Sequence, residues 1–135
     1  MSSATNENYL KALLSLSAEG QSVTVTALAA ALGVSKPAAN SMVKSLAAQG
    51  HLVYERYRPL RLTDAGRAAA ARIVRKHRLT EMYLVERMGF GEDEVHEIAE
   101  QMEHIQSPAF FARMDELLGY PTVDPHGSPI PPGEG

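Results

Sequence analysis

The sequence contains no cysteine, and this absence excludes several kinds of site at once. Disulfide bonds, iron–sulfur clusters and structural zinc sites of the thiolate kind all need cysteine sulfur. Long apolar runs are also missing, since no stretch approaches the roughly 20 residues that a membrane-spanning helix needs. The first residues lack the basic segment and the apolar core of a signal peptide. We therefore expect a cytoplasmic protein.

Charge is distributed unevenly along a chain whose 135 residues suffice for one ordinary domain, or one with a small extension. Acidic residues are scarce in residues 1–78, where 11 Lys and Arg face 4 Asp and Glu, a formal charge of +7. Residues 79–135 reverse this, with 2 basic and 12 acidic residues and a charge of −10. The basic part predicts a polyanionic partner, and the acidic part predicts a cation.

The first 50 residues are predicted to form three helices. Apolar spacing predicts these helices over residues 6–18, 25–32 and 36–49. Thr24 and Ser35 are suited to capping the second and third helices, and Gly33 to ending the second. Two short helices joined by a turn that contains glycine are typical of a helix-turn-helix motif.

A short β-hairpin is predicted after the third helix. Residues 51–55 and 60–63 alternate roughly with period two, on either side of a turn at 56–59. A hairpin in this place makes the motif a winged helix, so residues 1–63 are predicted to be a winged helix-turn-helix DNA-binding domain.

Candidate DNA contacts lie at the start and exposed face of the third helix and at the tip of the hairpin. Asn40 and Ser41 are suited to reading base edges, whereas the basic side chains are suited to neutralising phosphates. The full set is Ser35, Lys36, Pro37, Ala38, Asn40, Ser41, Lys44, Arg56 and Arg58.

The remainder is predicted to be helical, which makes the fold class mainly α with a small β-hairpin. Helices are predicted over residues 64–88, 92–106 and 108–118, followed by a Pro/Gly-rich tail or linker over residues 120–135. Apolar side chains crowd one side of the last helix, which indicates either core or a subunit interface. They are Phe110, Phe111, Met114, Leu117 and Leu118.

Six metal-capable side chains are spaced so that they share helix faces. They are His77 and Glu81 on one predicted helix, and His96, Glu100, Glu103 and His104 on the next. The last four stand at offsets 0, 4, 7 and 8, along one stripe of a helix. Carboxylates gathered there without a cation would repel one another. Mixed nitrogen and oxygen ligands suit Mn, Fe(II), Co, Ni and Zn, and argue against Cu(I).

Other interpretations of these residues stay open. A metal-dependent hydrolase with an incidental winged helix would use similar ligands, although no nucleophile or Gly-rich phosphate loop accompanies them. A winged-helix regulator could also sense an organic ligand or act without metal, with the acidic half as a protein-docking face. A metal-dependent regulator without enzymatic activity is the function we expect.

The order of these parts resembles the diphtheria toxin repressor family, which includes iron-dependent and manganese-dependent bacterial regulators. A winged helix-turn-helix is followed by KHRLTE, VHEIAEQMEH, a helix that starts with Ser-Pro, and DPHGSPIP. The resemblance covers nearly the whole chain. It implies a homodimer that binds operator DNA when loaded with Mn(II) or Fe(II). It also implies that residues 64–119 form a metal-binding and dimerisation domain.

The resemblance implies two metal sites in each subunit. The ancillary set is His77, Glu81 and His96, and the primary set is Glu100, Glu103 and His104. Glu100 stands where the iron branch has Cys and the manganese branch has Glu, which favours Mn(II). Asn8 stands where the family has a first-helix ligand, and can offer a neutral carbonyl oxygen. Lys11 stands where the manganese branch has a ligand Glu, and cannot bind metal.

Overall fold

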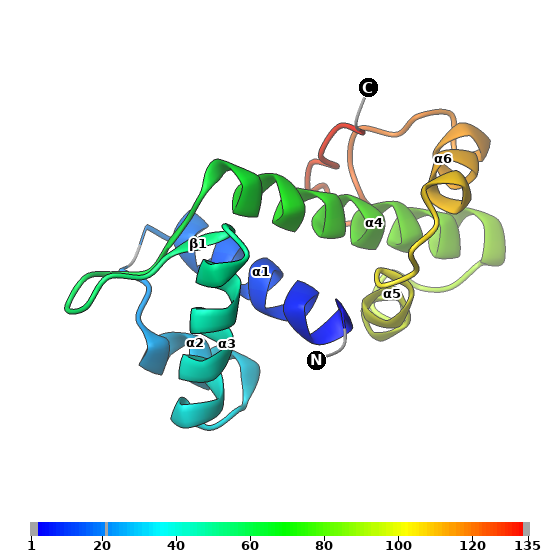
Figure 1. Ribbon diagram of the computed structural model, residues 1–135. Coiled ribbons are helices and arrows are strands. Elements are labelled where there is room, and N and C mark those ends of the chain that lie inside the picture. Colours follow the sequence, from blue (N-terminus) through cyan, green and yellow to red (C-terminus); the bar gives the residue numbers. More distant parts are fainter. Residues whose placement is uncertain (1–2, 21, 134–135) are drawn as a thin grey trace. The chain divides into compact units, whose positions relative to one another are not determined.

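The computed structural model describes residues 3–20 and 22–133 of the chain (Figure 1). These residues form six helices and two short strands, and the chain divides into two compact units, Met1–Ala71 and Arg72–Gly135. The division falls within the longest helix, α4 (Asp64–Met88). Residues 1–2, 21 and 134–135, which belong to the predicted domain and tail ranges, lie outside the described residues. No helix in the described part is long and apolar enough to cross a membrane.

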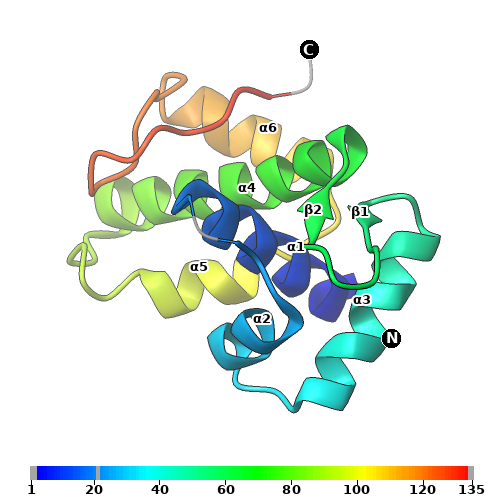
Figure 2. The same ribbon diagram turned by 90° about the vertical axis from the view of Figure 1, so that its left-hand side faces the viewer.

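The first unit begins with three helices that match the predicted ones closely. They are α1 (Ser3–Ala18), α2 (Val25–Leu32) and α3 (Lys36–Ala48). The hydroxyls of Thr24 and Ser35 each accept a hydrogen bond from a backbone N–H in the first turn of the following helix. Gly33, with a φ of 67°, ends α2 in the left-handed conformation. The short turn between α2 and α3 completes the helix-turn-helix (Figure 2).

The core of this unit is apolar. Side chains from the three helices and the hairpin are buried together: Tyr9, Leu10, Leu13, Val23, Leu28, Ala29, Ala39, Met42, Val43, Leu46, Leu52, Leu60 and Leu62. The inward face that α3 contributes is the face expected from its apolar spacing. Because that face is buried, the opposite face of α3 is left for solvent or a partner.

The wing is a short antiparallel hairpin of β1 (Leu52–Val53) and β2 (Arg61–Leu62), with Leu52 opposite Leu62. The hairpin approaches α4 closely at Gly66, where a Cβ atom would lie 2.0 Å from the backbone oxygen of His51. Glycine is therefore required at this position, because any larger residue would force the hairpin and the helix apart.

The second unit is built on α4, α5 (His96–Met102) and α6 (Pro108–Leu117). The helix predicted over residues 92–106 is shorter than expected, because 92–94 form turns, Val95 is a bend and the helix ends at Met102. The segment that follows is held by tertiary contacts instead, since Lys76 Nζ donates a hydrogen bond to the Ile105 carbonyl. Glu103 caps the end of α5 with helical backbone angles and donates its N–H to the Ala99 carbonyl, whereas His104 lies beyond the helix.

The segment expected to be a tail packs along α4 instead of extending freely (Figure 1). Val123 and Pro129 form an isolated antiparallel bridge. Ile130 joins an apolar cluster with residues of α4 and α6. Arg75 and Arg78 of α4 donate hydrogen bonds to carbonyl oxygens of the segment, which are those of Pro131 and Pro129. The sequence of this segment has no periodicity, so it gave no sign of the packing. The packing depends on a few single contacts rather than on a repeated pattern.

Candidate metal centre

Helix α4 places His77 and Glu81 one turn apart with both side chains buried. Their relative exposures are 6% and 2%, and His77 Nε2 lies 3.4 Å from Glu81 Oε2. A carboxylate so far from water must be compensated by a positive charge or by hydrogen bonds. These two residues form the fixed base of the site, because both project from one continuous helix.

Helix α5 begins with His96 and brings a second imidazole to the same carboxylate. His96 Nδ1 lies 3.7 Å from Glu81 Oε2, and the rings of His77 and His96 meet edge to face with centroids 4.8 Å apart. The other ring nitrogen of His96 lies 2.6 Å from Glu100 Oε1, one turn along α5. The side chains of His96 and Glu100 are 61% and 52% exposed, so this edge of the site faces water.

Glu103 is the most deeply buried carboxylate of the site, with an exposure of 0%. Its Oε1 lies 2.6 Å from His77 Nδ1, and its Oε2 lies 3.8 Å from His104 Nε2. His77 thus contacts a carboxylate from each of its two ring nitrogens. His77 belongs to the predicted ancillary set and Glu103 to the predicted primary set, so their contact makes the two sets neighbours.

The docked C-terminal segment supplies two further metal-capable residues that the sequence interpretation missed. Asp124 is buried, and His126 Nδ1 lies 3.9 Å from both Glu81 Oε1 and Asp124 Oδ2. Asp124 Oδ1 accepts hydrogen bonds from the backbone N–H groups of His126 and Ser128, which holds the turn in place. The Asp-x-His spacing inside DPHGSPIP was the available signal, but nothing in the sequence indicated that this turn packs against α4.

Two groups of side chains lie close enough to hold an ion. One is His77, Glu81 and His96, and the other is Glu81, Asp124 and His126; within each, ligand atoms lie within 4.8 Å of one another. Glu81 belongs to both. By the same distance, the part of the chain that the structure describes does not gather Glu100, Glu103 and His104 into a third group.

These residues fit a divalent cation. Glu81 Oε2 is buried and accepts no hydrogen bond from the described residues, although imidazole nitrogens surround it. A buried oxygen in that state is destabilising unless another positive partner is present. Imidazole and carboxylate donors without sulfur suit Mn(II), Fe(II), Co(II), Ni(II) or Zn(II).

The predicted first-helix ligand belongs to the other unit. Asn8 is an exposed residue of α1, and Lys11 is half-buried on the same helix. A role for Asn8 in metal binding therefore stays a prediction.

The predicted DNA contacts are accessible on the first unit. Asn40 is half-buried, and the other predicted residues of α3 and the wing are exposed: Ser35, Lys36, Pro37, Ala38, Ser41, Lys44, Arg56 and Arg58. At the wing tip Tyr57 is 91% exposed, with a φ of 66°, and the Arg56 guanidinium lies 4.9 Å from its ring centre. A basic helix face and a basic wing tip of this kind suit a phosphate backbone.

The residues predicted for a dimer interface divide into two groups. Phe111 and Met114 are buried in the core of the second unit, and Leu118 packs against that core. Phe110 and Leu117 are 39% and 54% exposed. These last two therefore remain available to a second subunit.

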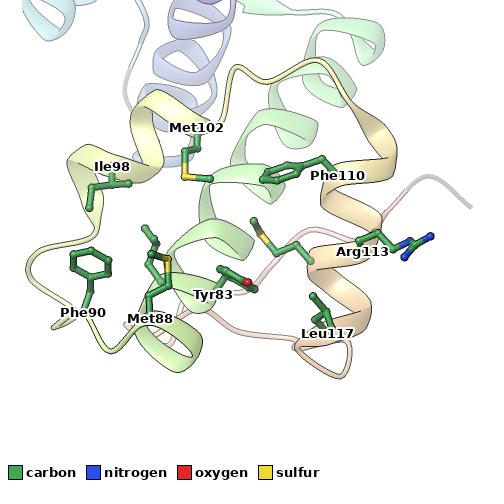
Figure 3. A pocket seen from close by; sticks show the side chains of 10 residues that line it. Tyr83, Met88, Phe90, Ile98, Met102, Phe110, Arg113 and Leu117 are labelled. Atoms are coloured by element: carbon green, nitrogen blue, oxygen red, sulfur yellow. The ribbon is translucent and has the colours of Figure 1, made fainter.

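The exposed pair borders an apolar pocket of about 370 Å³ (Figure 3). Figure 3 shows Tyr83 and Met88 of α4, Ile98 and Met102 of α5, and Phe110 and Leu117 of α6 around it. Met88 is itself 59% exposed. An exposed apolar surface of this kind is typical of an interaction site.

Both units match known protein families. Residues 1–60 match the family described as "Iron dependent repressor, N-terminal DNA binding domain". Residues 63–132 match "Iron dependent repressor, metal binding and dimerisation domain". The winged helix-turn-helix and the helical domain expected from the sequence are therefore confirmed.

Individual relatives agree with these families. The chain is 37% identical over 127 residues to the iron-dependent repressor IdeR of Mycobacterium tuberculosis, covering 94% of this chain and 55% of that protein. It is 32% identical over 127 residues to the diphtheria toxin repressor of Corynebacterium diphtheriae, covering 94% and 56%. A solved structure described as a manganese-dependent transcriptional repressor in complex with manganese matches with a TM-score of 0.85 and 41% identity, covering 96% of this chain and 60% of that one. The chain spans little more than half the length of the curated relatives it matches.

Proposed function

Because the chain belongs to the iron-dependent repressor family that includes the diphtheria toxin repressor and IdeR, we propose that it is a metal-dependent transcriptional repressor. The metal-loaded homodimer binds palindromic operator DNA and controls genes of metal homeostasis. Both matched domains are those of repressors, so a hydrolase with an incidental winged helix is not favoured.

The observation that carries this proposal is the environment of Glu81. Its buried Oε2 accepts no hydrogen bond from the described residues, and imidazoles of α4 and α5 lie within 3.7 Å of it. A third imidazole, that of His126, approaches the other oxygen at 3.9 Å. A cation bound here would supply the partner that Glu81 Oε2 lacks among the described residues.

Mn(II) is the ion that we propose. Its support is the donor set, in which Glu100 provides oxygen and no sulfur ligand exists in the chain. The solved manganese complex of a relative at 41% identity supports the same choice. Fe(II) is the second candidate, and Zn(II), Co(II) or Ni(II) would bind in vitro, because the same ligands accept them.

The ligand residues connect three separate segments of the second unit. His77 and Glu81 belong to α4, His96 begins α5, and His126 lies in the docked C-terminal segment. An ion in the group with His96 would fix α5 against α4, and an ion in the group with His126 would fix the C-terminal segment against α4. Helix α6, with exposed Phe110 and Leu117, follows α5 directly in the chain, so ordering α5 also orders the proposed dimer face.

Metal and DNA binding must then be reciprocally linked. Two recognition helices in a dimer have to lie about 34 Å apart, or a multiple of that, to read a palindrome. If metal binding selects dimers with that spacing, operator DNA must tighten metal binding by the same factor.

A DNA-binding experiment with controlled metal tests this proposal. The full chain is incubated with a random pool of duplex DNA, with Mn(II) or with EDTA, and bound sequences are recovered. We expect palindromic sites with Mn(II), and a loss of affinity for those sites in EDTA of about 5- to 150-fold, the usual range of coupling between two binding sites.

The double variant Glu103→Gln, His104→Ala should lose this metal dependence. Glu97→Gln is the matched control, because Glu97 is an exposed carboxylate of the same segment. Metal-dependent operator binding by the double variant would contradict the assignment of these residues, and operator binding in EDTA by the unaltered chain would contradict the metal-dependent mechanism.

A further inference from the structure

A polar side chain of the hairpin contacts the recognition helix in the first unit. Tyr54, the residue after β1, donates a hydrogen bond from its hydroxyl to Asn40 Oδ1 of α3 over 3.1 Å. Asn40 is half-buried, while Tyr54 is 38% exposed, so both groups stand at the edge of the surface that faces a partner.

This contact matters because an asparagine amide has two unlike ends. The oxygen accepts hydrogen bonds and the nitrogen donates two. A free Asn40 could rotate its amide and present either end to DNA. With Oδ1 held by the Tyr54 hydroxyl, the amide is oriented and its nitrogen remains available to donate.

Resting on the proposed DNA-binding function, we infer that Tyr54 is a positioning residue that makes Asn40 a hydrogen-bond donor in the major groove and so disfavours cytosine there. Both purines present the N7 acceptor and thymine presents the O4 acceptor, whereas cytosine presents only an amino donor. Asn40 lies in the second turn of α3, and the N-terminal part of a recognition helix is the part that meets base edges. Tyr54 thereby acts on sequence preference without touching DNA itself.

The simpler role for this hydrogen bond is to stabilise the fold. A purely structural bond between partly exposed groups would change stability slightly and would lower affinity for all DNA sequences alike. A positioning role changes the preference at one base pair and leaves the others as they were. Sequence preference is therefore the property that separates the two roles.

The test is sequence selection from a random duplex pool by the Mn(II)-loaded full chain and by its Tyr54→Phe variant. We expect the unaltered chain to exclude cytosine at one position of each half-site. Tyr54→Phe should lower that discrimination against cytosine about fivefold, the scale of one hydrogen bond, and change preferences elsewhere less than about twofold. Thermal unfolding of both proteins checks that the fold is retained.

Two further variants sharpen the result. Tyr120→Phe is the matched control, since Tyr120 lies in the second unit and is 65% exposed, and it should leave the preference unchanged. Asn40→Asp keeps the oxygen for Tyr54 but removes the donor, so the same position should now accept cytosine, whose amino group donates to a carboxylate.

The outcomes that overturn the inference are distinct from failure of the proposed function. Unchanged discrimination against cytosine in Tyr54→Phe overturns the inference alone, as does selection of cytosine by the unaltered chain at the position that Asn40→Asp alters. Recovery of no preferred sequence by any protein, with or without Mn(II), overturns the proposed function and this inference with it.

Discussion

The two units of the chain bury different kinds of side chain. Every buried polar or charged residue among the described ones lies in the second unit: His77, Thr80, Glu81, Glu103 and Asp124. The first unit buries apolar side chains and satisfies its helix ends with hydroxyl caps. Apolar packing stabilises the first unit by itself, whereas in the second unit the buried Oε2 of Glu81 is destabilising unless a cation accompanies it.

Metal depletion should have the largest effect of these changes, and it should destabilise the second unit only. With Mn(II) at 100 times its dissociation constant, binding should stabilise the second unit by about 2.7 kcal/mol. Hydrogen exchange measured by segment should therefore be faster in EDTA over residues 96–102 and 120–131, and unchanged over residues 25–48. Equal acceleration in α2 and α3 would show that the units do not differ in this way.

Gly66→Ala should destabilise the first unit by about 1–3 kcal/mol, the usual range for overpacking. The added Cβ would collide with the backbone oxygen of His51. Chemical denaturation with and without Mn(II) should give the same loss, because the collision lies within the first unit. Ala68→Ser, an exposed change on the same helix, should have little effect. If Mn(II) abolished the loss of stability in Gly66→Ala, the view that the two units are stabilised in different ways would be contradicted.

Glu81→Gln should have opposite effects in the two metal states. Without metal, removing a buried charge should raise stability by about 1 kcal/mol, since the amide is less costly to bury than a carboxylate. Adding Mn(II) should raise the stability of the variant only slightly, because the residue common to both proposed ligand groups is lost. Glu86→Gln on the same helix is the exposed control. If Glu81→Gln were less stable than the unaltered chain in EDTA, the view that the buried Glu81 carboxylate is destabilising without metal would be refuted.

Glu100→Cys should have the smallest effect, a change in metal preference. Its side chain is 52% exposed and contacts His96, at the edge of the cluster. A thiolate there is a softer ligand, so the ratio of the affinity for Zn(II) to the affinity for Mn(II) should rise by a few-fold to about tenfold. Competitive equilibrium dialysis with the two ions measures the ratio. An unchanged ratio would place Glu100 outside the metal site.

Much of the fold was predictable because its signals are local. The caps at Thr24 and Ser35, the glycine after α2 and the apolar face of α3 each depend on a few neighbouring residues. The bounds of α4 were predicted correctly for the same reason. Helix α5 was overestimated, because its end depends on a contact between Lys76 and Ile105 that lies far along the chain.

The candidate site was predictable only in part. His77 and Glu81 share a face of one helix, so their spacing alone placed them together. Their approach to His96 required the resemblance to a family, because spacing says nothing about contacts between helices. Asp124 and His126 were missed, since their segment has no periodicity and docks through Ile130 and two arginines.

The uneven exposure of the proposed ligands bears on how a regulator of this design would release its ions. Glu81 and His77 are buried, whereas the side chains of His96 and His126 are 61% and 44% exposed. In each of the two groups, an exposed imidazole could exchange with water while buried Glu81 stays in place. An ion held by either group would therefore have an exit that does not require the unit to unfold. A fall in metal concentration could then end repression without new protein synthesis.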